Sequence, residues 1–308
     1  MTVLRLGTRR SPLALAQSRL VAAALQLAGA GPVELVEIAT LGDVSKQPLT
    51  ELGGTGVFVS ALRDALLAGQ VDLAVHSLKD LPVAPADGLL LAAVPAREDP
   101  RDVLVARDAL TLDGLPDGAR IGTGSPRRAA QLAAMGRGFA VEGIRGNVDT
   151  RVGLVHSGQV DAVVLAYAGL SRLGRLDVVT EVLDPSDLLP APGQGALAVE
   201  CRADRADVVA ALLSLDDPAT RAAVTAERAL LARTEAGCSA PVGALAEVVN
   251  LGSSDPEIFL RAAVGTSDGT VRRLSITGPL GDPVGLGHQL ADLFLGEGAA
   301  GLWGERVR

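Results

Sequence analysis

The chain has 308 residues, of which 48% are hydrophobic but only 2% aromatic, and its formal charge at pH 7 is −8. That length exceeds one ordinary hydrophobic core, so we expect two or three domains packed mainly with Ala, Val, Leu and Ile. The acidic balance argues against bulk nucleic-acid binding, which needs an extended basic surface, and no apolar run is long and clean enough to span a bilayer.

The N-terminal residues and the cysteine content bear on the cellular compartment. Residues 3–6 predict a strand and lack the basic region and apolar core of a signal peptide. The two cysteines, Cys201 and Cys238, are too few for a disulfide framework. We therefore expect a cytoplasmic protein in reducing surroundings.

Strands and helices alternate along the first part of the chain. Ser11 and Pro12 form a favourable N-cap and N1 pair for an Ala- and Leu-rich helix that ends at Gly29. A glycine-rich loop over 41–56 precedes a second helix over 57–68, and a charged segment bounded by prolines, 95–101, predicts a linker. The predicted strands are 3–8, 33–40, 71–75 and 89–94.

A second alternating set follows the linker. Residues 121–128 predict a strand, a tight turn and a helix start, with Ser125 as N-cap and Pro126 at N1. A helix is predicted over 147–157, and a Pro/Gly-rich connection over 190–195. The other predicted strands are 103–106, 141–144, 162–165 and 196–200.

The pattern changes after Asp216-Asp217-Pro218. Helices over 221–233 and 286–295 flank strand-like segments at 257–264 and 271–277. The expected fold class is α/β, with two doubly wound domains and a smaller α+β C-terminal domain. The expected domains are 1–95 with 196–215, then 101–190, then 218–308. Two crossings between the large domains would create a cleft with a hinge.

The most informative segment is 74–82, where an apolar strand leads into His76, Lys79 and Asp80. The chain has only two lysines, so a lysine beside Asp80 at the carboxyl end of a strand is unlike generic surface charge. Ligands of α/β sheets bind at that edge. The alternative is a solvated Lys–Asp pair that closes a turn before Pro82, since charge clusters can also be structural.

A possible anion site follows the strand at 121. Residues 122–125 place backbone amides at a helix N-terminus, but Arg127 replaces the third glycine of a dinucleotide fingerprint. Arg127 and Arg128 in the first helical turn oppose the helix dipole, which is easier to explain if an anion lies between them and the amides. Two exposed arginines are the alternative.

Arginine recurs where predicted strands turn into helices. Each such residue alone could be a surface residue, but together they place cations where an α/β cleft binds its ligand. Guanidinium groups match carboxylates bidentately. The residues at these turns are Arg9, Ser11, Arg145, Arg151 and Arg172.

The cysteines differ in context. Cys201 ends an apolar strand, which predicts a buried and inert thiol. Cys238 lies in a small-residue loop with Gly237 and Pro241, which suggests an exposed turn where a thiol could be modified. The three histidines have no metal-ligand spacing, and no Gly-x-Ser-x-Gly elbow occurs, so neither a metal site nor a nucleophile triad is expected.

These motifs in order resemble the porphobilinogen deaminase (hydroxymethylbilane synthase) family over about residues 5–295. The motifs that carry the resemblance are Thr8-Arg9-Arg10-Ser11-Pro12-Leu13-Ala14-Leu15, Val75-His76-Ser77-Leu78-Lys79-Asp80, Arg97-Glu98-Asp99-Pro100-Arg101-Asp102, Arg127-Arg128, Ile144-Arg145-Gly146-Asn147-Val148, Gly193-Gln194-Gly195-Ala196 and Gly237-Cys238.

The resemblance implies that the two large domains are similar to periplasmic binding proteins. It also implies a transferase of tetrapyrrole and heme biosynthesis with a dipyrromethane cofactor held as a thioether on Cys238. A monomer is the default expectation for the oligomeric state. Four porphobilinogen molecules would be condensed head to tail on this primer with release of ammonia. The linear tetrapyrrole would then be released by hydrolysis.

The resemblance also implies residue roles. Asp80 would be catalytic, stabilising a positively charged azafulvene-like intermediate. Besides Cys238, the cofactor would be bound by Lys79, Thr123, Ser125, Arg127, Arg128 and Arg145. The substrate and growing chain would be bound by Arg9, Ser11, Arg151 and Arg172.

The chain departs from the family in its glycine-rich loop, where Thr55 and Glu51 occupy positions that are commonly basic. Thr55 weakens the idea that this loop clamps substrate by charge. Two other functions share the expected cleft: a small-anion binding module and an inactive homologue. Release of ammonia from porphobilinogen distinguishes the enzyme from both.

Overall fold

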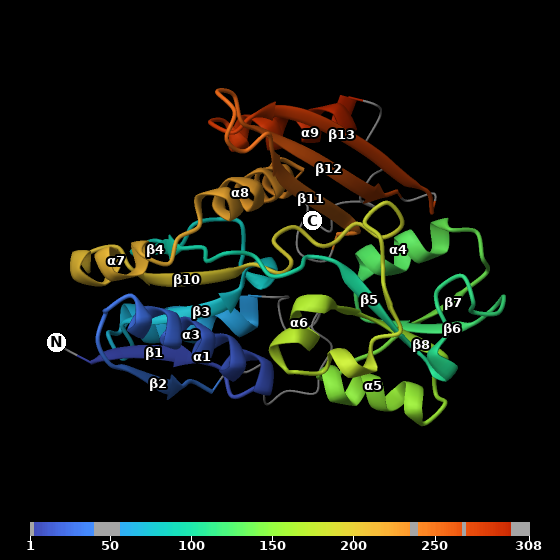
Figure 1. The fold of residues 1–308 in the computed structure, drawn as a ribbon, viewed down its shortest axis with the longest axis horizontal. Coiled ribbons are helices and arrows are strands. Elements are labelled where there is room, and N and C mark those ends of the chain that lie inside the picture. The colour runs from blue at the N-terminus through green and yellow to red at the C-terminus, as the bar shows by residue number, and fades with distance from the viewer. Residues whose placement is uncertain (1–2, 40–55, 235–239, 267–268, 297–308) are drawn as a thin grey trace, which may run out of the picture. The chain divides into compact units, whose positions relative to one another are not determined.

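The computed structural model describes residues 3–39, 56–234, 240–266 and 269–296 (Figure 1). The chain forms two compact units, Met1–Glu98 with Ala196–Arg221, and Asp99–Gly195 with Ala222–Arg308. The separate second and third domains expected at 101–190 and 218–308 stay a prediction. Among the residues described, no helix is long and apolar enough to cross a membrane.

The first unit has a mixed five-stranded sheet. Strand β1 is parallel to β2 and β3, whereas β10 is antiparallel to both β3 and β4. In spatial order the strands are β2 (Val33–Glu37), β1 (Leu4–Thr8), β3 (Leu73–Ser77), β10 (Leu197–Arg202) and β4 (Leu89–Ala93). The α-helices are α1 (Pro12–Leu27), α3 (Gly56–Leu67) and α7 (Ala206–Leu213), and the short 3-10 helix η1 (Leu78–Asp80) follows β3.

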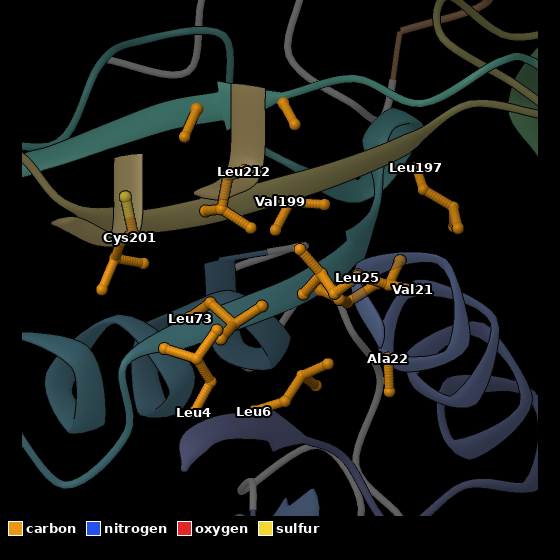
Figure 2. Packing of buried hydrophobic residues seen from close by; sticks show 14 residues of the cluster. Leu4, Leu6, Val21, Ala22, Leu25, Leu73, Leu197, Val199, Cys201 and Leu212 are labelled. Carbon is orange, nitrogen blue, oxygen red and sulfur yellow. The ribbon is translucent and has the colours of Figure 1, made fainter. Parts of the chain in front are cut away.

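Aliphatic side chains fill both faces of this sheet, as the low aromatic content predicts. On one face, Leu25 of α1 and Leu212 of α7 pack with Leu73 and Cys201 (Figure 2). On the other face, the buried residues of α3 pack with Ala74. Neighbouring residues of β3 therefore serve opposite faces, as the pleat of a strand requires. Cys201 is buried, and that burial raises the pKa of its thiol to about 11.

The second unit contains another mixed sheet. Strand β6 is parallel to β7 and β8, but β5 runs antiparallel to β8 and to β9. In spatial order the strands are β7 (Ala140–Gly143), β6 (Arg120–Thr123), β8 (Ala162–Ala166), β5 (Asp102–Ala106) and β9 (Glu181–Val182). The helices are α4 (Pro126–Ala134), α5 (Val148–His156), α6 (Tyr167–Arg172) and the 3-10 turns η2 (Arg107–Ala109) and η3 (Leu176–Val178).

The helices of this unit cover both faces of its sheet. Leu132 of α4 packs with Ile121 and Leu104 on one face. Val152 of α5 and Leu170 of α6 belong to the cluster on the other face. The unit is therefore doubly wound, like the first.

The rest of the second unit is a small α+β structure, with an antiparallel sheet in the order β11-β12-β13. Its elements are most of α8 (Pro218–Arg233), whose first four residues belong to the first unit, and β11 (Val242–Val249), β12 (Glu257–Gly265), β13 (Val271–Pro279) and α9 (Pro283–Gly296). The expected fold class, two doubly wound sheets and a smaller α+β part, is confirmed. The sequence analysis missed α6, α7, β9 and β11, and the strand expected at 33–40 is assigned only over Val33–Glu37.

Candidate active site

In the first unit, four predicted site residues follow two adjacent strands. Arg9 and Ser11 follow β1, and Lys79 and Asp80 form most of η1 after β3. Because β1 and β3 are parallel, with Leu6 paired to Leu73, both strands end at the same edge of the sheet. All four residues are partly exposed, so this edge carries two cations and one carboxylate.

The turn that carries Lys79 and Asp80 is anchored by apolar burial. Leu78 and Leu81 on either side of the pair are buried, and N of Leu78 donates to O of Ala196 (3.0 Å). Before the turn, Nε2 of Gln17 in α1 donates to Oγ of Ser77 (2.9 Å). These contacts fix the backbone and leave the Lys79 and Asp80 side chains at the surface.

Ser11 has a structural function of its own. Its Oγ accepts a hydrogen bond from N of Ala14 (3.3 Å), and Pro12 begins α1. The predicted N-cap is confirmed, whereas the predicted contact of Ser11 with substrate stays a prediction.

In the second unit, the turn between β6 and α4 is narrow. Thr123 is buried, and its Oγ1 accepts from N of Ser125 (3.2 Å). A Cβ at Gly124 would lie 2.7 Å from O of Ile144, so this position requires glycine. Ser125 is the N-cap of α4, as predicted, although its side chain makes no capping hydrogen bond.

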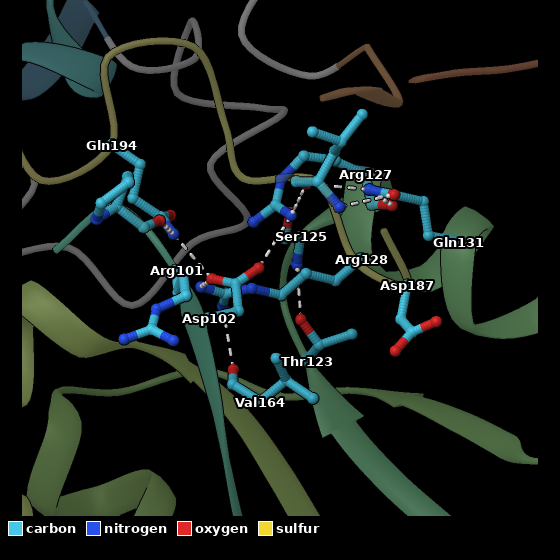
Figure 3. A network of polar contacts seen from close by, with 12 residues as sticks. Arg101, Asp102, Thr123, Ser125, Arg127, Arg128, Gln131, Val164, Asp187 and Gln194 are labelled. Carbon is cyan, nitrogen blue, oxygen red and sulfur yellow. Dashed lines mark hydrogen bonds and ion pairs between the residues drawn. The ribbon is translucent and has the colours of Figure 1, made fainter. Parts of the chain in front are cut away.

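Arg127 and Arg128 are only 3% and 5% exposed, which excludes the alternative of two exposed arginines. Nη1 of Arg127 forms an ion pair with Oδ2 of Asp102 (2.8 Å), and Nη2 of Arg128 forms one with Oδ1 (2.7 Å) (Figure 3). Nη1 of Arg127 also donates to O of Leu189 (2.5 Å), and Nη1 of Arg128 donates to O of Val164 (2.9 Å). Both guanidinium groups are thus held inside the protein.

This cluster contains more positive than negative charge. Burial raises the pKa of Asp102, but the adjacent Arg127 and Arg128 outweigh that effect and hold it far below its usual range. Burial lowers the pKa of Arg151, and the charge of Arg128 lowers it further. The Asp102 carboxylate therefore faces the guanidinium groups of Arg127 and Arg128, and the charge of Arg128 also acts on Arg151. Such an excess of positive charge favours binding of an anion.

Two further predicted residues follow the neighbouring strands. Arg145 follows β7, and Nη2 of Arg172 at the end of α6 donates to O of Gly195 (2.6 Å). Strands β7, β6 and β8 are parallel, so the turns that bear these arginines and Arg127 lie at one edge of the sheet. Arg151 lies in the first turn of α5, and its Nε donates to O of Gly146 (2.9 Å).

The donor set of this edge fits a ligand with several carboxylates. Nε of Arg127 and Nε of Arg128 are buried, and neither has a hydrogen-bond partner among the described residues. Buried donors are normally paired. A bound carboxylate would satisfy them and balance the excess positive charge.

The sequence analysis assigned no role to Asp102 or Gln194, although both lie in the motifs noted above. Nε2 of Gln194 donates to Oδ1 of Asp102 (2.8 Å) and to O of Pro100 (2.7 Å). One feature of the sequence could have identified Asp102. It is the single acidic residue of the strand Asp102–Ala106, which is otherwise entirely apolar, and a buried acid needs a partner.

Some predicted positions lie outside the described residues. These include Cys238 and two of the departures from the family pattern, Glu51 and Thr55. The described residues contain no group of three or more His, Cys, Asp or Glu side chains that could hold a metal ion.

Two family models match the chain. "Porphobilinogen deaminase, dipyromethane cofactor binding domain" matches residues 4–210, and "Porphobilinogen deaminase, C-terminal domain" matches residues 221–296. Among solved structures, the VFT2 domain of Bordetella pertussis BvgS is 18% identical with a TM-score of 0.43, over 69% of this chain and 86% of that one.

Curated relatives match over nearly the full length. Porphobilinogen deaminase 1 of Streptomyces coelicolor is 62% identical over 99% of this chain and 98% of its own. Porphobilinogen deaminase of Thermobifida fusca is 56% identical over 97% of this chain and 95% of its own length. Porphobilinogen deaminase of Mycobacterium tuberculosis is 55% identical over 99% of this chain and 100% of its own length. With this identity, and with the cofactor-domain model covering most of the chain, the protein belongs to the porphobilinogen deaminase family.

Proposed function

We propose that this chain is a hydroxymethylbilane synthase, a transferase that condenses four porphobilinogen molecules head to tail on a covalent dipyrromethane primer. Ammonia is released at each condensation, and hydrolysis then releases the linear tetrapyrrole. The observation that carries the proposal is the buried excess of arginine around Asp102 at the start of α4. Family membership supports the same conclusion.

The arginine cluster suits the charge of the substrate. Each porphobilinogen carries an acetate and a propionate, so negative charge accumulates as the chain grows. Only a cationic site can take such a chain out of water without a large desolvation cost. The residues proposed to bind carboxylates of the cofactor are Lys79, Thr123, Ser125, Arg127, Arg128 and Arg145, and those proposed for the substrate are Arg9, Ser11, Arg151 and Arg172.

When bound, the dipyrromethane supplies the pyrrole carbon to which the first substrate unit is joined. Arg127 and Arg128 have the buried donors that its carboxylates require, because the Nε atoms of both lack partners among the described residues. Cys238 is the proposed attachment residue, and it lies in the segment between α8 and β11. A thiol there offers the nucleophile that a thioether requires.

Asp80 is the proposed catalytic residue. Loss of ammonia from the aminomethyl group leaves a positive charge spread over the pyrrole, and a preorganised carboxylate stabilises such a developing charge. The buried Leu78 and Leu81 hold the turn that carries Asp80, so its position is set before the substrate binds. Arg127 and Arg128 then serve binding, while Asp80 serves the chemical step.

The class of ligand, the oligomeric state and the cellular compartment can also be inferred. The net charge of −8 and the absence of an extended basic run favour a small-molecule ligand over nucleic acid. We infer a cytoplasmic monomer that supplies tetrapyrrole biosynthesis, including that of heme.

The test combines ammonia release with mass spectrometry of the purified protein after incubation with porphobilinogen. We expect ammonia release, and a mass above that of the sequence by two porphobilinogen units joined with loss of ammonia. Peptide mapping should place the addition on Cys238. Cys238→Ala should lack both the addition and the activity, whereas Cys201→Ala should retain both, because Cys201 is a core thiol.

Binding of porphobilinogen without ammonia release would identify a binding module or an inactive homologue instead. Pyrroles on Cys201, or turnover by protein with unmodified Cys238, would contradict the proposed attachment site.

A further inference from the structure

We infer that Asp102 is a positioning residue, which sets the direction in which Arg127 and Arg128 offer their remaining donors to a carboxylate ligand. This inference rests on the proposed function for the identity of that ligand. Asp102 itself is fully buried, and both of its carboxylate oxygens are in contact with guanidinium groups of the protein. It therefore acts through the arginines.

The topology explains how a carboxylate reaches this place. Strand β5 runs antiparallel to β8, and its first residue, Asp102, is paired with Ala166, the last residue of β8. The start of β5 therefore lies at the same edge as the carboxyl ends of β6 and β8. The antiparallel strand β5 thus brings a carboxylate to the edge of the sheet where the turns after the parallel strands carry arginines.

The hydrogen-bond pattern shows what Asp102 does there. It occupies one Nη atom of each arginine, and the main-chain oxygens of Leu189 and Val164 also accept from Nη1 of the two residues. The Nε atom of each guanidinium is left without a hydrogen-bond partner among the described residues. Since a guanidinium is planar, fixing its Nη atoms also fixes the direction of its Nε–H bond.

Gln194 completes the arrangement from the other side. Its Nε2 donates to the Asp102 oxygen that also accepts from Arg128, and to O of Pro100 (Figure 3). The carboxylate is therefore fixed by a neutral donor as well as by two cations. Rotation of Asp102 would break contacts with Gln194 and both arginines together, so its orientation is strongly determined.

The sheet also offers a matched control at its opposite edge. Asp161 contacts two arginines as well, Nη2 of Arg107 (3.3 Å) and Nε of Arg120 (3.4 Å). It immediately precedes β8, so it lies at the edge away from the arginine turns. Removing its charge disrupts another carboxylate with two arginine partners, more exposed than Asp102, without touching the proposed ligand site.

The experiment compares Asp102→Asn, Asp102→Glu and Asp161→Asn with the parent, all prepared without cofactor. The first measurement is the porphobilinogen concentration at which half of the protein carries the dipyrrole, read by intact mass. The second is labelling of Arg127 and Arg128 by phenylglyoxal before porphobilinogen is added, read by peptide mapping.

We expect Asp102→Asn to raise the half-loading concentration by about 10-fold to 100-fold, because small misplacements of positioning groups have effects of that size. Both arginines should become reactive to phenylglyoxal. Asp161→Asn should match the parent in both measurements. Asp102→Glu keeps the charge but displaces the oxygens, so it should fold and give an intermediate half-loading concentration.

Parent-like loading and labelling of Asp102→Asn would overturn the inference. If Asp102→Asn does not fold, Asp102→Glu decides, and parent-like loading of that variant would show that the position of the carboxylate is unimportant. If the parent itself neither loads nor releases ammonia, the proposed function fails. The labelling comparison then still tests whether Asp102 positions the arginines.

Discussion

Gln131 binds the backbone of Leu189 through both ends of its side-chain amide. Its Nε2 donates to O of Leu189 (3.0 Å), and its Oε1 accepts from N of Leu189 (2.9 Å). Gln131 lies one helical turn after Arg127, which donates to the same carbonyl. Nη2 of Arg273 in β13 also donates to Oε1 of Gln131 (3.1 Å). The helix that bears the arginine pair is thereby tied both to the segment before the 190–195 connection and to the C-terminal sheet.

Gln131→Leu should destabilise the second unit. Leucine has a similar volume but leaves the buried N–H of Leu189 without an acceptor, which costs about 1–3 kcal/mol. The change should appear as a lower free energy of unfolding in urea. Gln159→Leu is the control, because Gln159 is exposed and its side chain donates to Oγ of the nearby Ser157. An equal loss of unfolding free energy in the two variants would show that the contact between Gln131 and Leu189 does not stabilise the unit.

Asp80→Asn should remove most of the activity and leave the fold intact. The amide keeps the shape of the side chain but loses the charge that stabilises the cation left on the pyrrole as ammonia departs, so we expect ammonia release to fall by about 10²–10³. Leu78 and Leu81 continue to hold the turn, so the circular dichroism spectrum should not change. Asp87→Asn, at an exposed position of the same unit, should keep parental activity. Near-parental turnover of Asp80→Asn would remove Asp80 from the chemical step.

Arg172→Leu should stall elongation, because a growing chain adds two carboxylates with each unit. Native gels or intact mass spectra should show enzyme-bound intermediates that accumulate before the tetrapyrrole stage. The control is Arg107→Leu, whose side chain pairs with Asp108 and Asp161 at the opposite edge of the same sheet. A parental distribution of stages in Arg172→Leu would contradict a role in elongation.

The order of elements could be predicted because each is marked locally. Ser11-Pro12 and Ser125-Pro126 mark helix starts, and both helices begin at the proline. The apolar run of β8 is fully buried up to its last residue, which its composition predicts. The alternation of such segments was sufficient to assign two doubly wound sheets.

No comparable signal in the local sequence indicates whether a strand is parallel or antiparallel to its neighbours. Strand β5 is as apolar as β8, yet it is antiparallel to it, and only this direction brings Asp102 to the arginines. The sequence analysis therefore located the cations at the strand-to-helix turns but missed their counter-ion. Contacts such as Gln194 with Asp102 join residues 92 positions apart, and no spacing rule predicts them.

Glu200 should make the stability of the first unit depend on pH in the acid range. Burial raises the pKa of Glu200, but the adjacent His76 and the hydrogen bonds from Arg63 outweigh burial and lower it from 4.5 to about 2. A lowered pKa stabilises the folded state above pH 4.5, and this contribution is lost as the pH falls from 4.5 towards 2. Arg63 approaches Glu200 to 2.8 Å from α3, and His76 to 3.2 Å from β3.

Glu200→Gln isolates this effect. It leaves Arg63 without its buried partner, so we expect a loss of about 3–5 kcal/mol at pH 7. The loss relative to the parent should shrink as the pH falls towards 2, as measured by urea unfolding at several pH values. Glu37→Gln removes an exposed carboxylate that pairs with the exposed Arg10 at 3.5 Å, and should change little. Parallel pH curves for the parent and Glu200→Gln would contradict the assignment.

Gly146→Ala should disturb the turn between Arg145 and α5. Gly146 has φ of +108°, and a Cβ there would lie 2.6 Å from Cγ2 of Thr150. Thr150 cannot easily retreat, because its N and Oγ1 both donate to Oδ1 of Asn147, the N-cap of α5. The strained backbone should cost about 1–3 kcal/mol. The displaced turn should also weaken loading of the dipyrromethane cofactor through Arg145, which would appear as a raised porphobilinogen concentration for half-loading of the cofactor-free protein.

Gly143→Ala provides the comparison, because it adds the same methyl group three residues earlier. Its Cβ would meet no atom within 4 Å, and its φ is not in the left-handed region. It should keep the parental half-loading concentration and lose little stability, since alanine at this position meets neither a clash nor backbone strain. If Gly146→Ala and Gly143→Ala behave alike in both measurements, the geometry of the Arg145 turn does not contribute to binding. A loss of stability in Gly146→Ala with an unchanged half-loading concentration would separate the fold of the turn from the proposed cofactor binding by Arg145.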